Sequence, residues 1–202
     1  LDQCIQLLES VDEPNRARDY CILTLFLNCG LRISELVALN VTDVRENQIR
    51  ILGKGNKERI LFLNDACRAA LDDWLEERSH QAAADPNALF LTRSHTRMTR
   101  DAVHYMVKQR LKKAGLDSTL YSSHKLRHTA ATLMLQNGVD VRTLQEVLGH
   151  ENLNTTQIYT HVDSENLRTA AKANPLAKVR PRKKQPEHTS SVEKSGQISP
   201  EK

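Results

Sequence analysis

Aromatic side chains are scarce in this chain of 202 residues, because one Trp, four Tyr and three Phe make up only 4% of it. The hydrophobic residues, 39% in all, are therefore mostly aliphatic, and we expect a core of Leu, Ala, Val and Ile. No apolar run approaches the roughly 20 residues that a membrane-spanning helix needs. The first residues also lack the basic and then apolar pattern of a signal peptide. The sequence thus favours one domain of ordinary size without a membrane segment.

A strong excess of one charge is absent as well. The chain holds 29 Lys and Arg against 25 Asp and Glu, a formal net charge of +4. Residues 163–202 carry nine basic and five acidic residues, which leaves 20 of each sign in residues 1–162 and a net charge of zero there. An anion-binding site in this neutral part must come from basic side chains that folding brings together, because bulk charge supplies none.

Closely spaced cysteine pairs are missing too. The four cysteines are Cys4, Cys21, Cys29 and Cys67, and no two of them form a CxxC motif. This spacing argues against a disulfide framework and against a cysteine zinc site. We expect reduced thiols in or near the core.

The hydrophobic pattern is mainly helical, with one change to the period of strands. The apolar run before Gly30 predicts a buried central helix that this glycine ends. A glycine-rich, basic tip between two alternating segments predicts a β-hairpin, so the expected fold class is mainly α with a small hairpin. Apolar residues almost vanish after Pro175, and residues 176–202 are predicted to be disordered. The expected helices are 1–10, 14–28, 33–39, 64–79, 99–113, 124–137, 141–148, 155–161 and 164–173, and the expected strands are 48–52, 59–63 and 88–91.

Basic and nucleophilic side chains recur at four places along the chain. Arginines stabilise phosphate charge, a histidine moves a proton near neutral pH, a lysine protonates a leaving oxygen, and a tyrosine can attack phosphorus. Together these groups predict phosphoryl transfer without a metal ion. They are Arg32 after the buried helix, Lys54 and Lys57 in the hairpin tip, His124 and Arg127 three residues apart on one helical face, and His150 followed by Tyr159.

Each of these residues alone has a simpler interpretation. An arginine at a helix start or a lysine in a hairpin tip is usually solvated, and a tyrosine on a short amphipathic helix usually packs in the core. His124 and His128 are spaced i, i+4, as in some zinc sites, but no third ligand has the matching spacing. No metal site and no cofactor are therefore predicted.

Four segments in this order resemble the catalytic domain of the tyrosine recombinases, most closely those of the bacterial Xer type. An HxxR motif alone is common by chance, whereas four motifs in order are specific. The resemblance extends over residues 1–170 and implies the tyrosine recombinase catalytic-domain fold. The segments are Gly30–Leu36, Gly53–Arg59, His124–His128, and Leu148–His150 followed by Thr155–Tyr159.

The resemblance implies a phosphate-binding group among these residues. Arg32 and Arg127 would hold the scissile phosphate, and His150 would add a hydrogen bond to it. Glu35 lies one turn after Arg32 and would support that arginine by hydrogen bonding.

The resemblance also implies how the strand is cut. Tyr159 would attack the phosphate while His124 accepts its proton, and Lys54 would protonate the 5′-oxygen leaving group. The products would be a 3′-phosphotyrosyl link and a free 5′-hydroxyl, and the hydroxyl of a partner strand would reverse the step. Because the covalent link keeps the bond energy, neither metal nor cofactor is needed.

Further polar residues are expected to contact the DNA backbone. The start of the predicted helix 99–113 suits phosphates, because helix N-termini present free N–H groups. A solvated helix is the alternative for this segment. The predicted DNA-binding residues are Lys57, Arg59, Arg97, Thr99, Arg100 and Lys125.

A domain organisation follows from the same resemblance. Residues 1–175 would form the catalytic domain, in which 164–173 is the helix that family members pass to a neighbouring subunit of a homo- or hetero-tetramer on DNA. Residues 176–202 would be a basic tail. Family members also carry an N-terminal core-binding domain that is absent from this chain, so the chain alone is expected to recombine poorly.

The implied function is recombination of double-stranded DNA at a specific site in the bacterial cytoplasm, in association with the nucleoid. The Xer type implies resolution of chromosome and plasmid dimers. An integrase of a mobile element is the alternative with the same chemistry. A type IB topoisomerase is a second alternative, which would relax supercoiled DNA without needing two sites. A non-catalytic DNA-binding module is a third, for which Tyr159→Phe would change nothing measurable.

Overall fold

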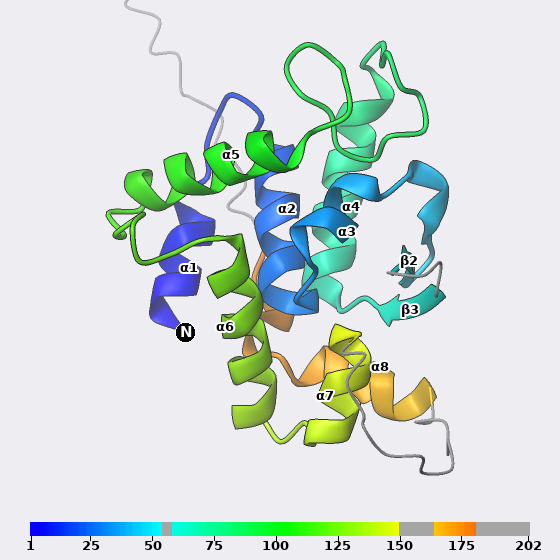
Figure 1. The fold of residues 1–202 in the computed structure, drawn as a ribbon, viewed down its shortest axis with the longest axis vertical. Helices are drawn as coiled ribbons and strands as arrows, with labels where there is room; N and C mark the ends of the chain where they lie inside the picture. The colour runs from blue at the N-terminus through cyan, green and yellow to red at the C-terminus, as the bar shows by residue number, and fades with distance from the viewer. Residues whose placement is uncertain (54–57, 150–163, 181–202) are drawn as a thin grey trace, which may run out of the picture.

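Helices make up most of the structure, and one small sheet lies at their side (Figure 1). The computed structural model describes residues 1–53, 58–149 and 164–180. This arrangement confirms the predicted fold class. The elements are α1 (Asp2–Glu9), α2 (Arg16–Cys29), α3 (Ile33–Ala38), η1 (Val41–Asp43), β1 (Val44–Arg45), β2 (Gln48–Leu52), β3 (Glu58–Phe62), α4 (Asp65–Ser79), α5 (Arg100–Lys113), α6 (Ser123–Gln136), α7 (Val141–Leu148), α8 (Ser164–Ala173) and η3 (Pro175–Lys178).

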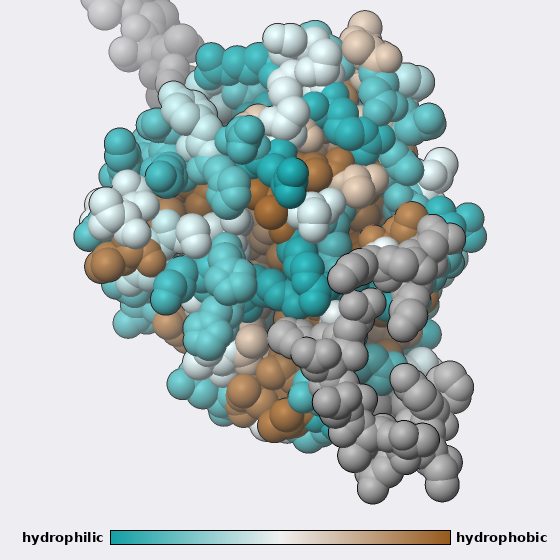
Figure 2. Space-filling model, viewed as in Figure 1, coloured by the Kyte–Doolittle hydropathy of each residue, from teal (hydrophilic) through white to brown (hydrophobic). Residues whose placement is uncertain are grey.

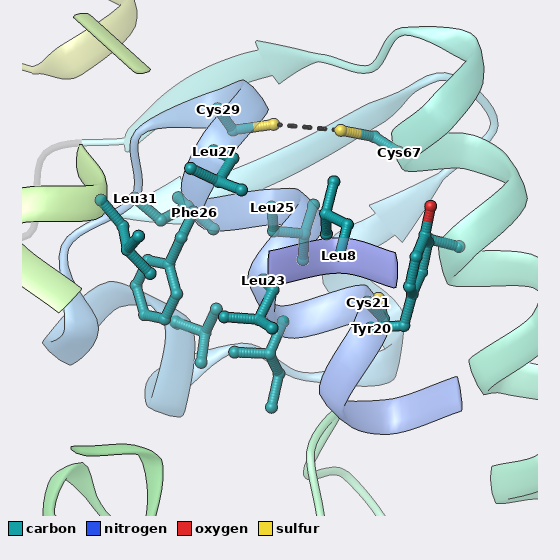
Figure 3. Packing of buried hydrophobic residues seen from close by; sticks show 14 of the residues in the cluster. Leu8, Tyr20, Cys21, Leu23, Leu25, Phe26, Leu27, Cys29, Leu31 and Cys67 are labelled. Carbon is teal, nitrogen blue, oxygen red and sulfur yellow. Dashed lines mark hydrogen bonds between the residues drawn. The ribbon is translucent and has the colours of Figure 1, made fainter. Parts of the chain in front are cut away.

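The helix α2 forms the centre of the core, as its apolar sequence predicts. Every residue from Arg18 to Cys29 is buried, and the helix packs against α4 and α6. Figure 3 shows Leu8 of α1 and Cys67 of α4 beside the side chains of α2. The helix begins two residues later than predicted, because Asn15 has a left-handed φ of 67° and stands outside it.

Gly30 ends α2 in a left-handed conformation with φ of 60°, which confirms the predicted stop. A side chain there would conflict with α7, since a Cβ on Gly30 would lie 2.6 Å from Cδ2 of Leu148. The glycine therefore lets the end of α7 approach the end of α2 closely.

All four cysteines are buried and unpaired, which confirms their expected place in the core. The Sγ atoms of Cys29 and Cys67 lie 3.7 Å apart. Burial raises the pKa of the Cys21 thiol well above its ordinary value. These thiols thus act as small apolar groups in the core.

The predicted hairpin is present as β2 and β3, with Ile49 opposite Leu61 and Ile51 opposite Arg59. The two-residue strand β1 extends it to a three-stranded antiparallel sheet of order β1-β2-β3. A strand of two residues is too short to show alternation in the sequence, so it was not predicted.

The prediction of a strand at residues 88–91 is wrong. This segment forms only isolated bridges, Asn40 with Ala88 and Leu91 with Arg97. Its apolar residues are buried because the loop crosses the core, where the indole of Trp74 donates a hydrogen bond of 2.9 Å to the carbonyl oxygen of Leu89. Burial without a neighbouring strand explains the apolar run.

Regular structure continues beyond Pro175, where the sequence predicts a disordered segment to begin. The turn η3 buries Leu176 completely, and Asn174 donates 2.9 Å to the carbonyl oxygen of Leu27 while accepting from the Leu176 amide. The prediction that disorder begins at residue 176 is therefore wrong for residues 176–180. Residues 181–202 lie outside the described residues, as does the helix predicted at 155–161.

The helix α8 is present over the predicted residues and packs against α7 and β3 of its own chain. The guanidinium of Arg168 lies 4.8 Å from the ring centre of Phe62, and Asn64 donates 3.0 Å to the carbonyl oxygen of Ala171. Among the described residues, no helix is long and apolar enough to cross a bilayer.

Replacing Leu176 by Ala is expected to lower the free energy of unfolding by about 2–4 kcal/mol, because it empties a fully buried site. Urea denaturation measures the change. Leu120→Ala serves as the control, since Leu120 is 65% exposed and its loss should cost less than about 0.5 kcal/mol. Equal costs for the two variants would contradict the observed anchoring of residues 176–180.

Candidate active site

A single buried carboxylate, that of Glu35, lies at the centre of a cluster of arginines. One oxygen accepts hydrogen bonds of 2.8 Å from Nη1 of Arg32 and 2.8 Å from Nη1 of Arg59. The other accepts 2.8 Å from the backbone amide of Arg32 and 3.0 Å from Nη2 of Arg59. Arg32 caps the start of α3 and Arg59 comes from β3, so Glu35 joins two elements that are 24 residues apart in sequence.

The arginines also converge on the end of α7. The last carbonyl groups of a helix have no partners within it and carry partial negative charge, so they attract guanidinium groups. The helix ends here because Gly149 is left-handed, with φ of 65°. The contacts are Arg59 Nε to the Val147 oxygen at 3.3 Å, Arg127 Nη2 to the Leu148 oxygen at 2.8 Å, and Arg32 Nη2 to the Gly149 oxygen at 2.9 Å.

Arg127 is the buried arginine of this cluster. It comes from α6 and also donates through Nη1 to the carbonyl oxygen of Gly30, the residue that ends α2. Burial, followed by the positive charge of Arg32, lowers the pKa of Arg127 to about 10, and it stays protonated at neutral pH. Arg32 differs, since its side chain is 41% exposed.

The charges in the cluster do not cancel. Burial acts to raise the pKa of Glu35, but hydrogen bonds and attraction from Arg59 and Arg32 outweigh it, and the pKa lies below its ordinary value of 4.5. Glu35 is therefore ionised at neutral pH. Three arginines against one carboxylate leave a net charge of +2 in this cluster, which favours an anion beside the exposed edge of Arg32.

His124 lies in the first turn of α6, one turn before Arg127. The hydroxyl of Ser122 caps this helix by accepting from the amide of Lys125 at 3.4 Å. His124 and Lys125 are both exposed, whereas Arg127 is buried. The predicted pair therefore lies on one helix, with the histidine at the surface one turn before the buried arginine.

The structure brings together Arg32, Glu35 and Arg127, which the sequence predicted as one group. Four of the other predicted site residues lie outside the described residues: Lys54, Lys57, His150 and Tyr159. Their neighbours in sequence do belong to the cluster, because Arg59 follows the hairpin tip and Gly149 precedes His150.

Two residues predicted to contact DNA are instead bound to groups of the protein. Arg59 is 16% exposed and is bound to Glu35 as described above. Arg97 pairs with Asp85 at 2.8 Å and also donates to the Val37 and Leu39 carbonyl oxygens and to the Asn40 side chain. Both guanidinium groups are engaged by groups of the protein, although the Arg97 side chain is 31% exposed. This engagement argues against the predicted phosphate contact most strongly for Arg59.

The other predicted DNA-binding residues among the described ones are at the surface. Thr99 caps α5 by accepting 3.2 Å from the Ala102 amide, and Arg100 and Lys125 are exposed. Their helices, α5 and α6, lie on the face seen in Figure 1, which is mainly hydrophilic in Figure 2. This face suits a polar partner.

The inward role of Arg59 was missed, but the sequence contains a signal for it. Arg59 and Leu61 are two residues apart in β3 and so share a face of the strand. Leu61 is buried, which turns Arg59 toward the interior. The carbonyl oxygens at the end of α7 had no such signal, because only folding brings them near.

A model of the phage integrase family matches residues 1–166. The chain belongs to the phage integrase family. It is 52% identical over 178 residues to the tyrosine recombinase XerC of Caldanaerobacter subterraneus subsp. tengcongensis, covering 88% of this chain and 50% of that protein. It is 41% identical over 170 residues to XerC of Vibrio cholerae serotype O1 (strain ATCC 39541 / Classical Ogawa 395 / O395), covering 83% of this chain and 54% of that protein. The chain thus spans about half the length of these relatives.

Solved structures of Xer recombinases are similar to this member of the family. The crystal structure of XerA recombinase superposes with a TM-score of 0.69 at 34% identity, covering 83% of this chain and 61% of that chain. The pre-cleavage complex of XerH with its difH substrate has a TM-score of 0.65 at 32% identity, covering 84% and 52%. The resemblance to Xer-type tyrosine recombinases is therefore confirmed.

Replacing Glu35 by Gln in this integrase-family chain is expected to lower the free energy of unfolding by about 1–3 kcal/mol at pH 7, because an amide group would face arginine donors. The folded-state pKa of Glu35 lies below its ordinary value, so its ionic contribution is present above pH 4.5 and is lost as the pH falls through the folded-state pKa. Urea denaturation should show the difference between the two chains shrinking in acid.

Glu58→Gln is the matched control on β3. Glu58 is 54% exposed and pairs with Arg50 at the surface, so its replacement should cost less than about 1 kcal/mol. Equal costs at both positions, or a Glu35 effect that grows in acid, would contradict the proposed charge state of Glu35.

Proposed function

We propose that this chain is the catalytic part of a site-specific recombinase that cuts and rejoins DNA through a 3′-phosphotyrosyl intermediate. The observation that carries the proposal is the cluster of Arg32, Arg127 and Glu35 at the end of α7. It lies in a chain that is 52% identical to a XerC recombinase. The activity proposed is of the Xer type, resolution of chromosome and plasmid dimers.

The charge of the cluster fits the reaction. A DNA phosphodiester carries one negative charge, and attack by an oxygen nucleophile adds a second in the transition state. The net charge of +2 from Arg32, Arg59, Arg127 and Glu35 is suited to that second charge. Arg32 has an exposed edge that can donate to a phosphate oxygen. Arg127 adds positive charge from the buried side of the cluster.

The remaining steps are assigned to the other residues of the four sequence motifs. Tyr159 attacks phosphorus, its proton passes to His124, and Lys54 protonates the departing 5′-oxygen. The P–O5′ bond breaks as the P–O bond to tyrosine forms, so the number of phosphate ester bonds is unchanged. His150 donates a hydrogen bond to the phosphate. A 5′-hydroxyl from the partner strand then reverses the exchange.

Metal ions have no part in this proposal. The described residues contain no group of three or more His, Cys, Asp or Glu placed to hold one ion. The arginine pair provides the positive charge that a metal would bring in a metal-dependent nuclease.

Double-stranded DNA with a specific site is the proposed substrate, and the complex of XerH with difH supports it. A tetramer joined by exchange of α8 is also proposed. In this structure α8 packs against its own β3 and α7, so exchange requires α8 to leave that place. The proposed location is the bacterial cytoplasm, at the nucleoid.

The test uses a library of nicked duplexes with randomised arms, which trap the covalent product. A duplex retarded on a denaturing gel is expected with the original protein, also in the presence of a chelator. Tyr159→Phe should abolish the adduct, because it removes the attacking hydroxyl. Tyr105→Phe is the control, since Tyr105 is a 68% exposed tyrosine on α5 and its loss should leave the yield unchanged. An undiminished adduct in Tyr159→Phe, or a need for a divalent metal, would refute the mechanism.

A further inference from the structure

Arg59 lies between two parts of the candidate site that are distant in sequence. It belongs to β3, the strand that leaves the glycine-rich tip, and it is the second residue of that strand. Its three donor atoms reach Glu35 of α3 and the Val147 carbonyl oxygen of α7. At 16% exposure it is nearly enclosed, unlike an arginine that binds DNA from the surface.

The end of α7 rests directly on this guanidinium group. A Cβ on Gly149 would lie 3.0 Å from Cζ and 3.0 Å from Nη1 of Arg59. A side chain there would be in unusually tight contact with the guanidinium group, and the left-handed φ of 65° also favours glycine. The backbone at Gly149 is therefore held against Arg59 on one side while its oxygen accepts from Arg32.

We propose that Arg59 is a positioning residue of the active site, which fixes Glu35 and the end of α7 so that Arg32 is presented to the phosphate. It acts through Glu35 and through the backbone of α7, without contact to the DNA. The inference rests on the function proposed above, since it concerns the same site.

Charge gives the reason why Arg59 matters for Arg32. Arg59 takes up one hydrogen bond on each oxygen of Glu35, so Arg32 shares the carboxylate instead of neutralising it alone. The charged groups that face Glu35 from the packed elements are Arg32 of α3, Arg59 of β3 and Arg127 of α6. Loss of Arg59 lowers the net charge of the cluster from +2 to +1 and leaves a buried carboxylate with fewer donors.

Arg59 also connects two described elements, β3 and α7, that adjoin the proposed reacting groups in sequence. It follows Lys54 by five residues, and Gly149 directly precedes His150. One guanidinium thus joins the strand after the tip to the helix end before His150. A change at Arg59 is expected to disturb the end of α7 as well as β3.

Arg59→Met tests the inference by single-turnover cleavage of the nicked duplex that gives the adduct. Its rate should fall by about 10- to 100-fold, as is typical for residues that orient a reacting group. Affinity for the duplex should change less than about threefold. Because the buried Glu35 loses its main donor, its pKa should rise, and the acid limb of the pH–rate profile should move to higher pH. Arg59→Lys should restore part of the rate.

Arg50→Met is the matched control, since Arg50 lies on β2 of the same hairpin, is 49% exposed, and pairs with Asp43 and Glu58 instead of Glu35. The cleavage rate of this variant should stay within about twofold of that of the original protein, and the acid limb of its pH–rate profile should not move. If Arg59→Met instead weakens duplex binding and lowers the salt slope by about one, Arg59 contacts a phosphate and the inference is wrong. A rate unchanged in Arg59→Met would overturn it equally.

Amide hydrogen exchange gives a readout that does not need activity. The Gly149 amide donates 3.1 Å to the carbonyl oxygen of Glu146, so its exchange reports on the end of α7. Exchange should accelerate in Arg59→Met and not in Arg50→Met. If the original protein forms no adduct, the proposed function fails. The hydrogen-exchange measurement still decides whether Arg59 anchors α7. Equal exchange in both variants would refute the anchoring.

Discussion

The carboxylate of Glu35 is buried, and an ionised carboxylate is tolerated in a protein interior only when charged donors surround it. This constraint explains why Arg32 and Arg59 meet here, although they come from a short helix and from a strand. It also explains why the site carries an excess of positive charge. One carboxylate holds two arginines in place and can neutralise only one of them, so the cluster remains attractive to phosphate.

The scaffold joins this cluster to the core. The buried helix α2 ends at Gly30, whose carbonyl oxygen accepts from Arg127 and whose missing side chain leaves room for Leu148. The end of α7 therefore touches the core on one side and the arginines on the other. A disturbance of packing near Gly30 is transmitted to the carbonyl groups that orient the arginines.

Local signals in the sequence predicted most of the fold. Gly30 ends α2 as expected, while Asn64 and Thr99 cap α4 and α5 and Gly149 ends α7 close to the predicted bounds. Arg32, Glu35 and Arg127 were predicted as one group because their motifs resemble those of a known family, and the structure brings them together.

The parts of the fold and site that the sequence did not predict depend on contacts between distant segments. Apolar composition falls after Pro175, yet Leu176 finds a buried place that depends on α2 and α4. The apolar segment 88–91 is covered by Trp74 without a neighbouring strand. Arg59 and Arg97 were predicted to contact DNA. Their actual partners are carboxylates and carbonyl oxygens from distant segments, which the sequence alone does not bring near them.

The most direct test of this account is the titration of the Glu35 side-chain carboxyl by ¹³C NMR, with the resonance assigned through Glu35→Gln. The account predicts a carboxylate that stays ionised into acid, with a pKa below the ordinary 4.5, because Arg59 and Arg32 outweigh the effect of burial. A pKa at or above 4.5 would show that the arginines do not share this carboxylate as described, and would contradict the charge of +2 on which the proposed chemistry depends.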